Sequence, residues 1–135
     1  MNYEVKQIEK FKFIEEGQGE PLILLHGLFG ALSNFKDLIE HFKHSYKVVV
    51  PILPLFDLDL FHTTVGGIAK HVHKFIETRD YNNIHLLGNS LGGHVALLHV
   101  LKHPERVNLL FLQEVRDYLK TEWVTVIQSA ETTST

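Results

Sequence analysis

Short apolar runs alternate with amphipathic segments along most of the chain, and this alternation constrains the fold more than any other feature. Each run is only a few residues long and lacks the polar alternation of a half-exposed strand, as expected for strands buried on both faces. The runs are PLILLHG at 21–27, YKVVVPILP at 46–54, NIHLLG at 83–88 and VNLLFL at 107–112. Strands and helices in strict alternation predict a mostly parallel α/β sheet with helices on both faces.

Three helices are predicted between these strands. The first starts near Ser33, which is the expected N-cap, and the second starts near Thr63 or Thr64. The third runs from about Leu91 to His103 and is stopped by Pro104. The apolar residues at helical spacing are Phe35, Leu38, Ile39 and Phe42 in the first helix, and Val65, Ile68, Ala69, Val72, Phe75 and Ile76 in the second.

The two ends of the chain differ from this repeating part. Residues 3–16 mix charged and apolar residues in alternation, which predicts an antiparallel hairpin at the edge of the sheet. Residues 113–129 fit one helical stripe, although WVTVI also favours a strand through its β-branched residues, and a helix is the prediction. The expected organisation is an α/β core over 1–112, a C-terminal helix over 113–129 and a frayed tail over 130–135.

Composition excludes several classes of function. The chain has 13 basic and 16 acidic side chains, a net charge of −3 and no dense basic run, so nucleic acid is not an expected partner. No apolar run approaches the roughly 20 residues that span a bilayer, and we expect a cytoplasmic chain. Cysteine is absent and the ten histidines form no HExxH pattern, so no metal site is expected.

One serine lies in a pattern that carries chemistry. Gly88-Asn89-Ser90-Leu91-Gly92 fits Gly-x-Ser-x-Gly between a buried strand and a helix, and Gly93 follows. A serine on so sharp a turn needs neighbours without a Cβ atom, and the turn places the next amide at a helix N-terminus. The pattern predicts a nucleophile elbow, with Ser90 as nucleophile and the Leu91 amide as an oxyanion donor.

A second glycine-rich turn precedes this one by some sixty residues. His26-Gly27-Leu28-Phe29-Gly30 follows the strand at 21–25, and its small residues allow a backbone amide to face the same site. The amide of Leu28 is the first choice for the second oxyanion donor, and that of Phe29 is the alternative.

HGLFG, GNSLGG and the later HPERV resemble the N-terminal half of an α/β-hydrolase over about residues 3–112. The resemblance implies a three-layer fold, a serine hydrolase acting on esters or related acyl compounds, no cofactor, and a small-molecule acyl substrate. By the same resemblance His26 is a structural residue of the oxyanion turn rather than the catalytic base. A serine in place of aspartate argues against the epoxide hydrolase and haloalkane dehalogenase branches.

The catalytic acid and base are harder to find. In the family the order is serine, acid, histidine, yet the last histidine, His103, falls at the far end of the helix that follows Ser90, nearly 20 Å away. His94 and His99 lie on that same helix and are expected to pack. Glu114 is a candidate acid just past the sixth strand, or else a residue in the first turn of the last helix. His62, on a loop after the second buried strand, is the remaining candidate base.

We expect the seventh and eighth strands of the family and any lid to be missing, which gives a sheet truncated after the sixth strand. Its edge at 107–112 would then expose unpaired backbone groups and favour a homo-oligomer, unless residues 113–129 cover it. Two alternatives to an active enzyme remain open: a non-catalytic hydrolase-like domain that binds a ligand or associates with itself, and a truncated hydrolase fragment.

Overall fold

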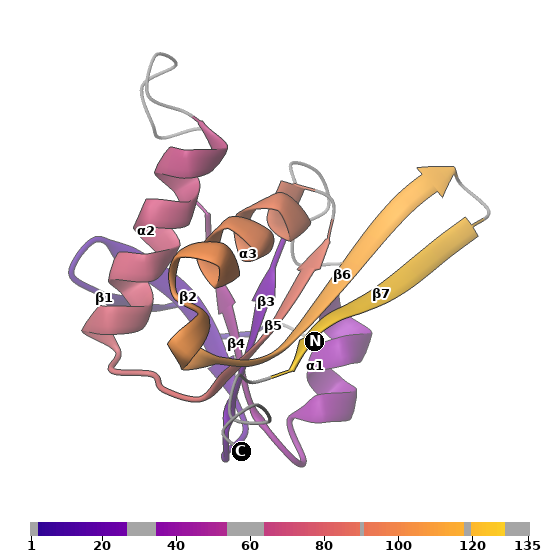
Figure 1. Ribbon diagram of the computed structural model, residues 1–135. Coiled ribbons are helices and arrows are strands. Elements are labelled where there is room, and N and C mark those ends of the chain that lie inside the picture. The colour runs from indigo at the N-terminus through magenta and orange to yellow at the C-terminus, as the bar shows by residue number, and fades with distance from the viewer. Residues whose placement is uncertain (1–2, 27–34, 54–63, 90, 118–119, 129–135) are drawn as a thin grey trace, which may run out of the picture.

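The computed structural model describes residues 3–26, 35–53, 64–89, 91–117 and 120–128, with the backbone alone described from 108 onward. Seven strands form one sheet in the order β1-β2-β4-β3-β5-β6-β7 (Figure 1). The strands are β1 (Lys6–Ile8), β2 (Phe11–Glu16), β3 (Pro21–Leu25), β4 (Lys47–Pro51), β5 (Ile84–Asn89), β6 (Val107–Asp117) and β7 (Lys120–Gln128).

The centre of the sheet is parallel and its margins are antiparallel. β3 lies between β4 and β5, and β6 continues the parallel part beyond β5. β1 and β2 form the predicted N-terminal hairpin, which joins the sheet through an antiparallel pairing of β2 with β4. The predicted α/β sheet with an antiparallel N-terminal hairpin is therefore confirmed, with three of the six described pairings parallel.

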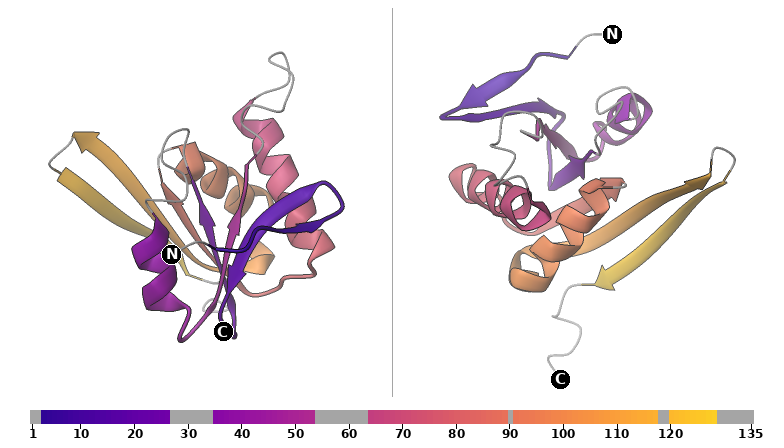
Figure 2. Two further views of the ribbon diagram at one scale, coloured as in Figure 1. Left: turned by 180° about the vertical axis from the view of Figure 1, so that it is seen from behind. Right: turned by 90° about the horizontal axis from the view of Figure 1, so that it is seen from above.

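Helices cover both faces of this sheet. α1 (Lys36–Phe42) lies on one face, whereas α2 (Val65–Thr78) and α3 (Leu91–Lys102) lie on the other, as the view along the layers shows (Figure 2). A short 3₁₀ helix, η2 (Pro104–Arg106), follows α3, so Pro104 ends the third helix close to the predicted residue.

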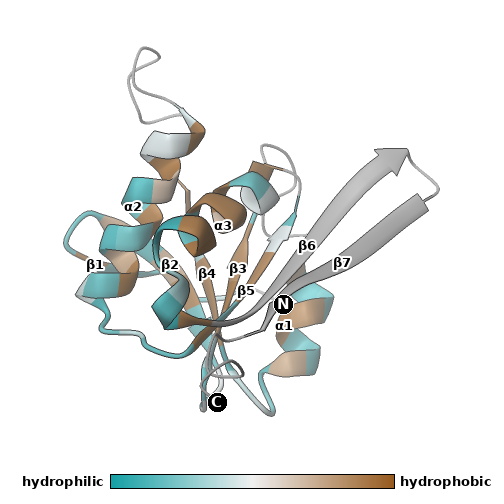
Figure 3. Ribbon diagram, in the orientation of Figure 1, coloured by the Kyte–Doolittle hydropathy of each residue, from teal (hydrophilic) through white to brown (hydrophobic). Residues whose placement is uncertain are grey.

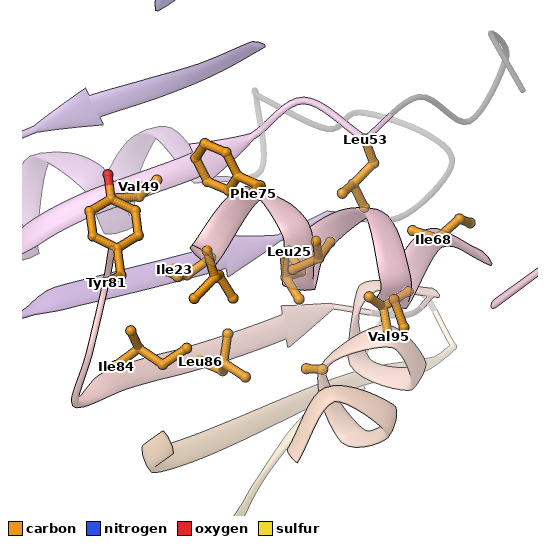
Figure 4. Close-up of a cluster of buried hydrophobic side chains, with 14 of the residues drawn as sticks. Ile23, Leu25, Val49, Leu53, Ile68, Phe75, Tyr81, Ile84, Leu86 and Val95 are labelled. Carbon is orange, nitrogen blue, oxygen red and sulfur yellow. The ribbon is translucent and has the colours of Figure 1, made fainter. Parts of the chain in front are cut away.

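Successive residues of the central strands point to opposite faces and build two cores. Ile23 and Leu25 of β3 belong to the cluster beneath α2 and α3, whereas Leu22 and Leu24 belong to the cluster beneath α1. All four are at most 5% exposed, and each such side chain contributes about 1.5–3 kcal/mol. Figure 3 shows the resulting apolar centre, and Figure 4 shows the larger cluster, which includes Phe75, Ile84 and Val95.

The helix starts were predicted with mixed success. Thr64 caps α2, because its hydroxyl accepts a hydrogen bond from the Gly67 amide at 2.9 Å. The expected cap of α1 is wrong, since that helix begins at Lys36 with Phe35 in the cap position and no side-chain cap. Ser33 itself lies outside the described residues.

The predicted C-terminal helix over 113–129 is wrong. β6 continues to Asp117, and β7 runs back along it in antiparallel pairing from Lys120 to Gln128. A helix here would leave the β6 edge with unpaired backbone groups, whereas the β-branched WVTVI stretch can pair with that edge. β7 thus extends the described sheet by one antiparallel strand beyond the sixth, and the sheet stays open, as in a truncated hydrolase fold.

Candidate active site

The junction between β5 and α3 is short. β5 ends at Asn89 and α3 begins at Leu91, so only position 90 lies between the strand and the helix (Figure 1). A Cβ atom on Gly88 would lie 2.5 Å from the carbonyl oxygen of Gly92 and 2.6 Å from the Cα atom of Gly93. Such approaches leave no room for a side chain, so this turn requires the glycine that the sequence pattern supplies.

The first turn of α3 also touches the end of β3. A Cβ atom on Gly92 would overlap the carbonyl oxygen of Leu25 and lie 2.9 Å from that of His26. The backbone of the second glycine-rich segment therefore starts directly beside the helix that follows position 90. The structure places the end of β3 and the first turn of α3 together at the carboxyl ends of β3 and β5, where ligands bind in open parallel sheets.

His26 connects two strand ends. Its side chain is 4% exposed, and its Nε2 accepts a hydrogen bond of 3.0 Å from the backbone amide of Leu53, just after β4. In the neutral ring the proton is then on Nδ1. Because Nε2 is already occupied by this backbone donor, the geometry supports a structural role for His26.

Leu91 opens α3 and carries one of the first amides of the helix, which have no carbonyl partner within it. The helix dipole adds a partial positive charge at this point. Asn89, on the other side of position 90, is buried, and its Oδ1 has no hydrogen-bond partner in the described part of the chain. Two polar groups thus flank position 90: the Leu91 amide, a donor that suits an anion, and Asn89 Oδ1, a buried acceptor.

Several predicted site residues lie outside the described residues. They are Gly27, Leu28, Phe29, Gly30, His62 and Ser90.

Glu114 occupies a different setting from the one predicted. It lies within β6 rather than after it, opposite Glu122 of β7, and the alternative of a helical first turn is also wrong. The parallel pairing of β5 with β6 ends at Asn89 and Gln113, so Glu114 is one residue beyond the last pair. Its backbone nevertheless lies at the same edge of the sheet as the β5–α3 turn.

The histidines of α3 differ in their surroundings. His94 is exposed, so the expectation that it packs is wrong, whereas His99 is buried at 1% exposure as expected. His103 follows the last turn of α3 and stacks on His73 of α2, with ring centroids 3.6 Å apart. Sequence reasoning missed this cluster of histidines because it depends on how α2 and α3 pack against each other. The one sequence signal for it was the spacing of His99 and His103, which is one helical turn.

The described residues contain no group of three or more His, Cys, Asp or Glu side chains arranged to hold a metal ion. Nor is any helix among them both long and apolar enough to cross a membrane.

Comparison with known proteins identifies the fold. The sequence model of the alpha/beta hydrolase fold family matches residues 20–129. Among solved structures, an alpha/beta hydrolase enzyme from the metagenome of sediments of the Mar Chica lagoon, Morocco, is 45% identical with a TM-score of 0.77, over 81% of this chain and 50% of that one.

Two curated relatives are named as a lipase and an acetyltransferase. Lipase 1 of Psychrobacter immobilis is 28% identical over 77% of this chain and 35% of its own length. Ethanol acetyltransferase 1 of Kluyveromyces marxianus is 33% identical over 64% of this chain and 25% of its own length. The chain thus spans half or less of the length of each of these proteins. With the family match, the sheet order and the glycine turns in agreement, this chain belongs to the alpha/beta hydrolase fold family.

Proposed function

We propose that the chain is a serine hydrolase that acts on a carboxylic ester or a related acyl substrate, with Ser90 as its nucleophile. The observation that carries the proposal is the turn between β5 and α3, where Gly88 and Gly92 have no space for a side chain. A turn of this kind serves to raise one residue above the sheet and to aim the next amide at it.

The oxyanion would be held by two backbone amides. The Leu91 amide is one, supported by its place at the N-terminus of α3. The Leu28 amide is the other, with that of Phe29 as the alternative, supported by the backbone contact between Gly92 and the end of β3. Loss of one such donor typically costs about 3 kcal/mol of transition-state stabilisation.

The reaction then proceeds in two steps. The Ser90 oxygen attacks the acyl carbon, its proton passes to a base, and the alcohol leaves with a proton as the acyl-enzyme forms. Water attacks the acyl-enzyme, releases the carboxylic acid and restores the Ser90 hydroxyl. No cofactor takes part in either step.

Glu114 and His62 are the proposed acid and base. The place of Glu114, one residue beyond the Asn89–Gln113 pair, supports the first assignment. The assignment of His62 rests on its place in the sequence, on a loop predicted to follow the second buried strand.

The choice of an acyl substrate rests on what the relatives share. By their names, one of them is a lipase and the other transfers an acetyl group to ethanol. A small-molecule ester is therefore the substrate class to test first.

A second candidate function is a non-catalytic domain that associates with itself. β7 supports it, because this nine-residue strand is the last in the described sheet and has no neighbour on its outer side. Such an edge can pair with a second copy of the chain.

Hydrolysis of p-nitrophenyl acetate and butyrate by the purified chain separates the two. The proposal predicts release of p-nitrophenol that is lost in Ser90→Ala and reduced in His62→Gln. A burst of one equivalent of p-nitrophenol without further turnover would agree with Ser90 as the nucleophile but contradict His62 as the base. Equal rates for the wild type and Ser90→Ala would refute the proposed enzyme.

A further inference from the structure

A groove between α2 and α3 has the features of a second binding site. Its volume is about 370 Å³. Its walls are formed by Gly66, Ala69, Lys70 and His73 from α2, by His99 and Lys102 from the end of α3, and by His103, which follows α3. His99 lies eight residues after Leu91, or about 12 Å along the helix, so the groove is distinct from the candidate active site.

His99 is the buried wall of this groove. Its side chain is 1% exposed, and neither ring nitrogen has a hydrogen-bond partner within the described ranges. Burial, followed by electrostatic interactions with His103, His73 and Arg106, lowers the pKa of His99 to about 4, so the ring is neutral and carries one donor and one acceptor. A buried polar ring without partners is unfavourable, and a hydrogen-bonding ligand in the groove that His99 lines would relieve this cost.

His73 adds a further unpaired nitrogen. Its ring lies 5.5 Å from that of His99, centroid to centroid, and is stacked on His103 with the planes 1° apart. Nε2 of His73 is 2.9 Å from the carboxylate of Glu77, whereas its Nδ1 is buried without a partner. Two neighbouring imidazoles therefore leave three ring nitrogens unsatisfied at one place.

The charge around the groove is positive. Lys70 and Lys102 both line it and are exposed, and neither has an ion-pair partner in the part of the chain that the structure describes. Arg106 adds a positive potential at His73 and His99, against which the carboxylates of Glu77 and Glu105 act at His73. Two lysines favour an anion over a metal cation, in agreement with the lack of a metal-ligand group among the described residues.

We propose that this groove binds a small oxyanion, a phosphate or a carboxylate, between α2 and α3. Lys70 and Lys102 supply the charge, and the rings of His73 and His99 supply hydrogen bonds from the buried side. The site is independent of the proposed hydrolysis at Ser90, so either can fail without the other.

Titration of the full chain followed by the NMR signals of the histidine rings tests this site. Inorganic phosphate and acetate are added separately, each against sodium chloride at the same ionic strength. The proposal predicts saturable shifts of the His99 and His73 signals with at least one of the two anions and none with chloride. The anion that binds more tightly, phosphate or acetate, identifies the ligand class.

Two lysines on α2 provide a matched pair of variants. Lys70→Ala, which removes a groove lysine, should weaken binding at least tenfold. Lys74→Ala should bind like the wild type, because Lys74 lines a separate hollow with Glu9 and Phe11. Equal weakening in both would show a general effect of net charge and would overturn the site.

His99→Leu distinguishes a ligand role from a structural one. If His99 serves the ligand and not the fold, His99→Leu should lose the saturable NMR shifts of His73, while its melting temperature stays constant or rises. Where this variant does not fold, the comparison of Lys70→Ala with Lys74→Ala decides. Absence of saturable shifts with both anions, or shifts with zinc chloride alone, would contradict the proposal.

Discussion

Gly92 in the first turn of α3 lies so close to Leu25 at the end of β3 that a Cβ atom on Gly92 would overlap the Leu25 carbonyl oxygen. This contact is between backbone atoms, so no rotation of a side chain relieves it. It fixes where α3 starts relative to the sheet, and hence where the amide of Leu91 points.

Gly92→Ala is therefore expected to destabilise the fold by about 3 kcal/mol or more, because α3 must move away from β3. Gly66→Ala is the matched control in the first turn of α2, where the nearest heavy atom to a Cβ would be the Thr64 hydroxyl at 3.8 Å. That variant should be neutral or more stable by up to about 1 kcal/mol. Urea unfolding of the two variants measures the difference, and similar stabilities would reject the contact as described.

His26→Ala should also reduce stability. It removes the acceptor of the Leu53 amide and leaves that buried N–H unpaired, which costs about 1–3 kcal/mol. His94→Ala, on the exposed side of α3, should change the free energy of unfolding by less than about 0.5 kcal/mol. An unaffected His26→Ala would show that the hydrogen bond contributes nothing to the fold.

Acid should destabilise the protein partly through His99. Burial lowers the pKa of His99 in the folded state to about 4, against 6.5 for the ordinary side chain, so the unfolded chain binds a proton first as the pH falls. The neutral His99 ring therefore contributes up to about 3 kcal/mol to the free energy of unfolding. This contribution is complete above pH 6.5 and is lost as the pH falls from 6.5 to about 4. Unfolding measured in chloride buffers should show a shallower pH dependence in His99→Leu, and an identical dependence in both proteins would contradict this assignment.

Self-association should depend on β7. Its outer side is unpaired in the described sheet, and its register with β6 places Val124 opposite Leu112. Sedimentation velocity is expected to show a concentration-dependent dimer that is weakened at higher concentrations of urea below the unfolding transition. A monomer at all concentrations would remove the self-associating domain from the candidate functions.

Sequence reasoning reached the local features of this fold and missed those that depend on distant pairing. The central strands and the β5–α3 junction were predictable because each depends on a short run of neighbouring residues, such as the apolar stretch ending at Gly88. The segment that forms β7 was predicted as a helix, since WVTVI fits both periods and only the open edge of β6 decides between them.

The candidate site shows the same division. The proposed roles of Ser90 and the Leu91 amide rest on one sequence pattern, whereas the hydrogen bond between His26 and Leu53 joins residues 27 apart in the chain. The grouping of His73 with His99 likewise depends on helix packing, which single-sequence periodicity does not specify. Glu114 was expected just past the sixth strand or in the first turn of a helix, and the extension of β6 places it in a strand.

The most direct test of the account is covalent labelling with a fluorophosphonate probe, which reacts with an activated serine, followed by mass spectrometry of the modified peptide. The account predicts one adduct, on Ser90, that is absent in Ser90→Ala and retained in Ser45→Ala, a control at an exposed turn. An unlabelled wild-type chain, or labelling that persists in Ser90→Ala, would contradict the assignment of Ser90 as nucleophile.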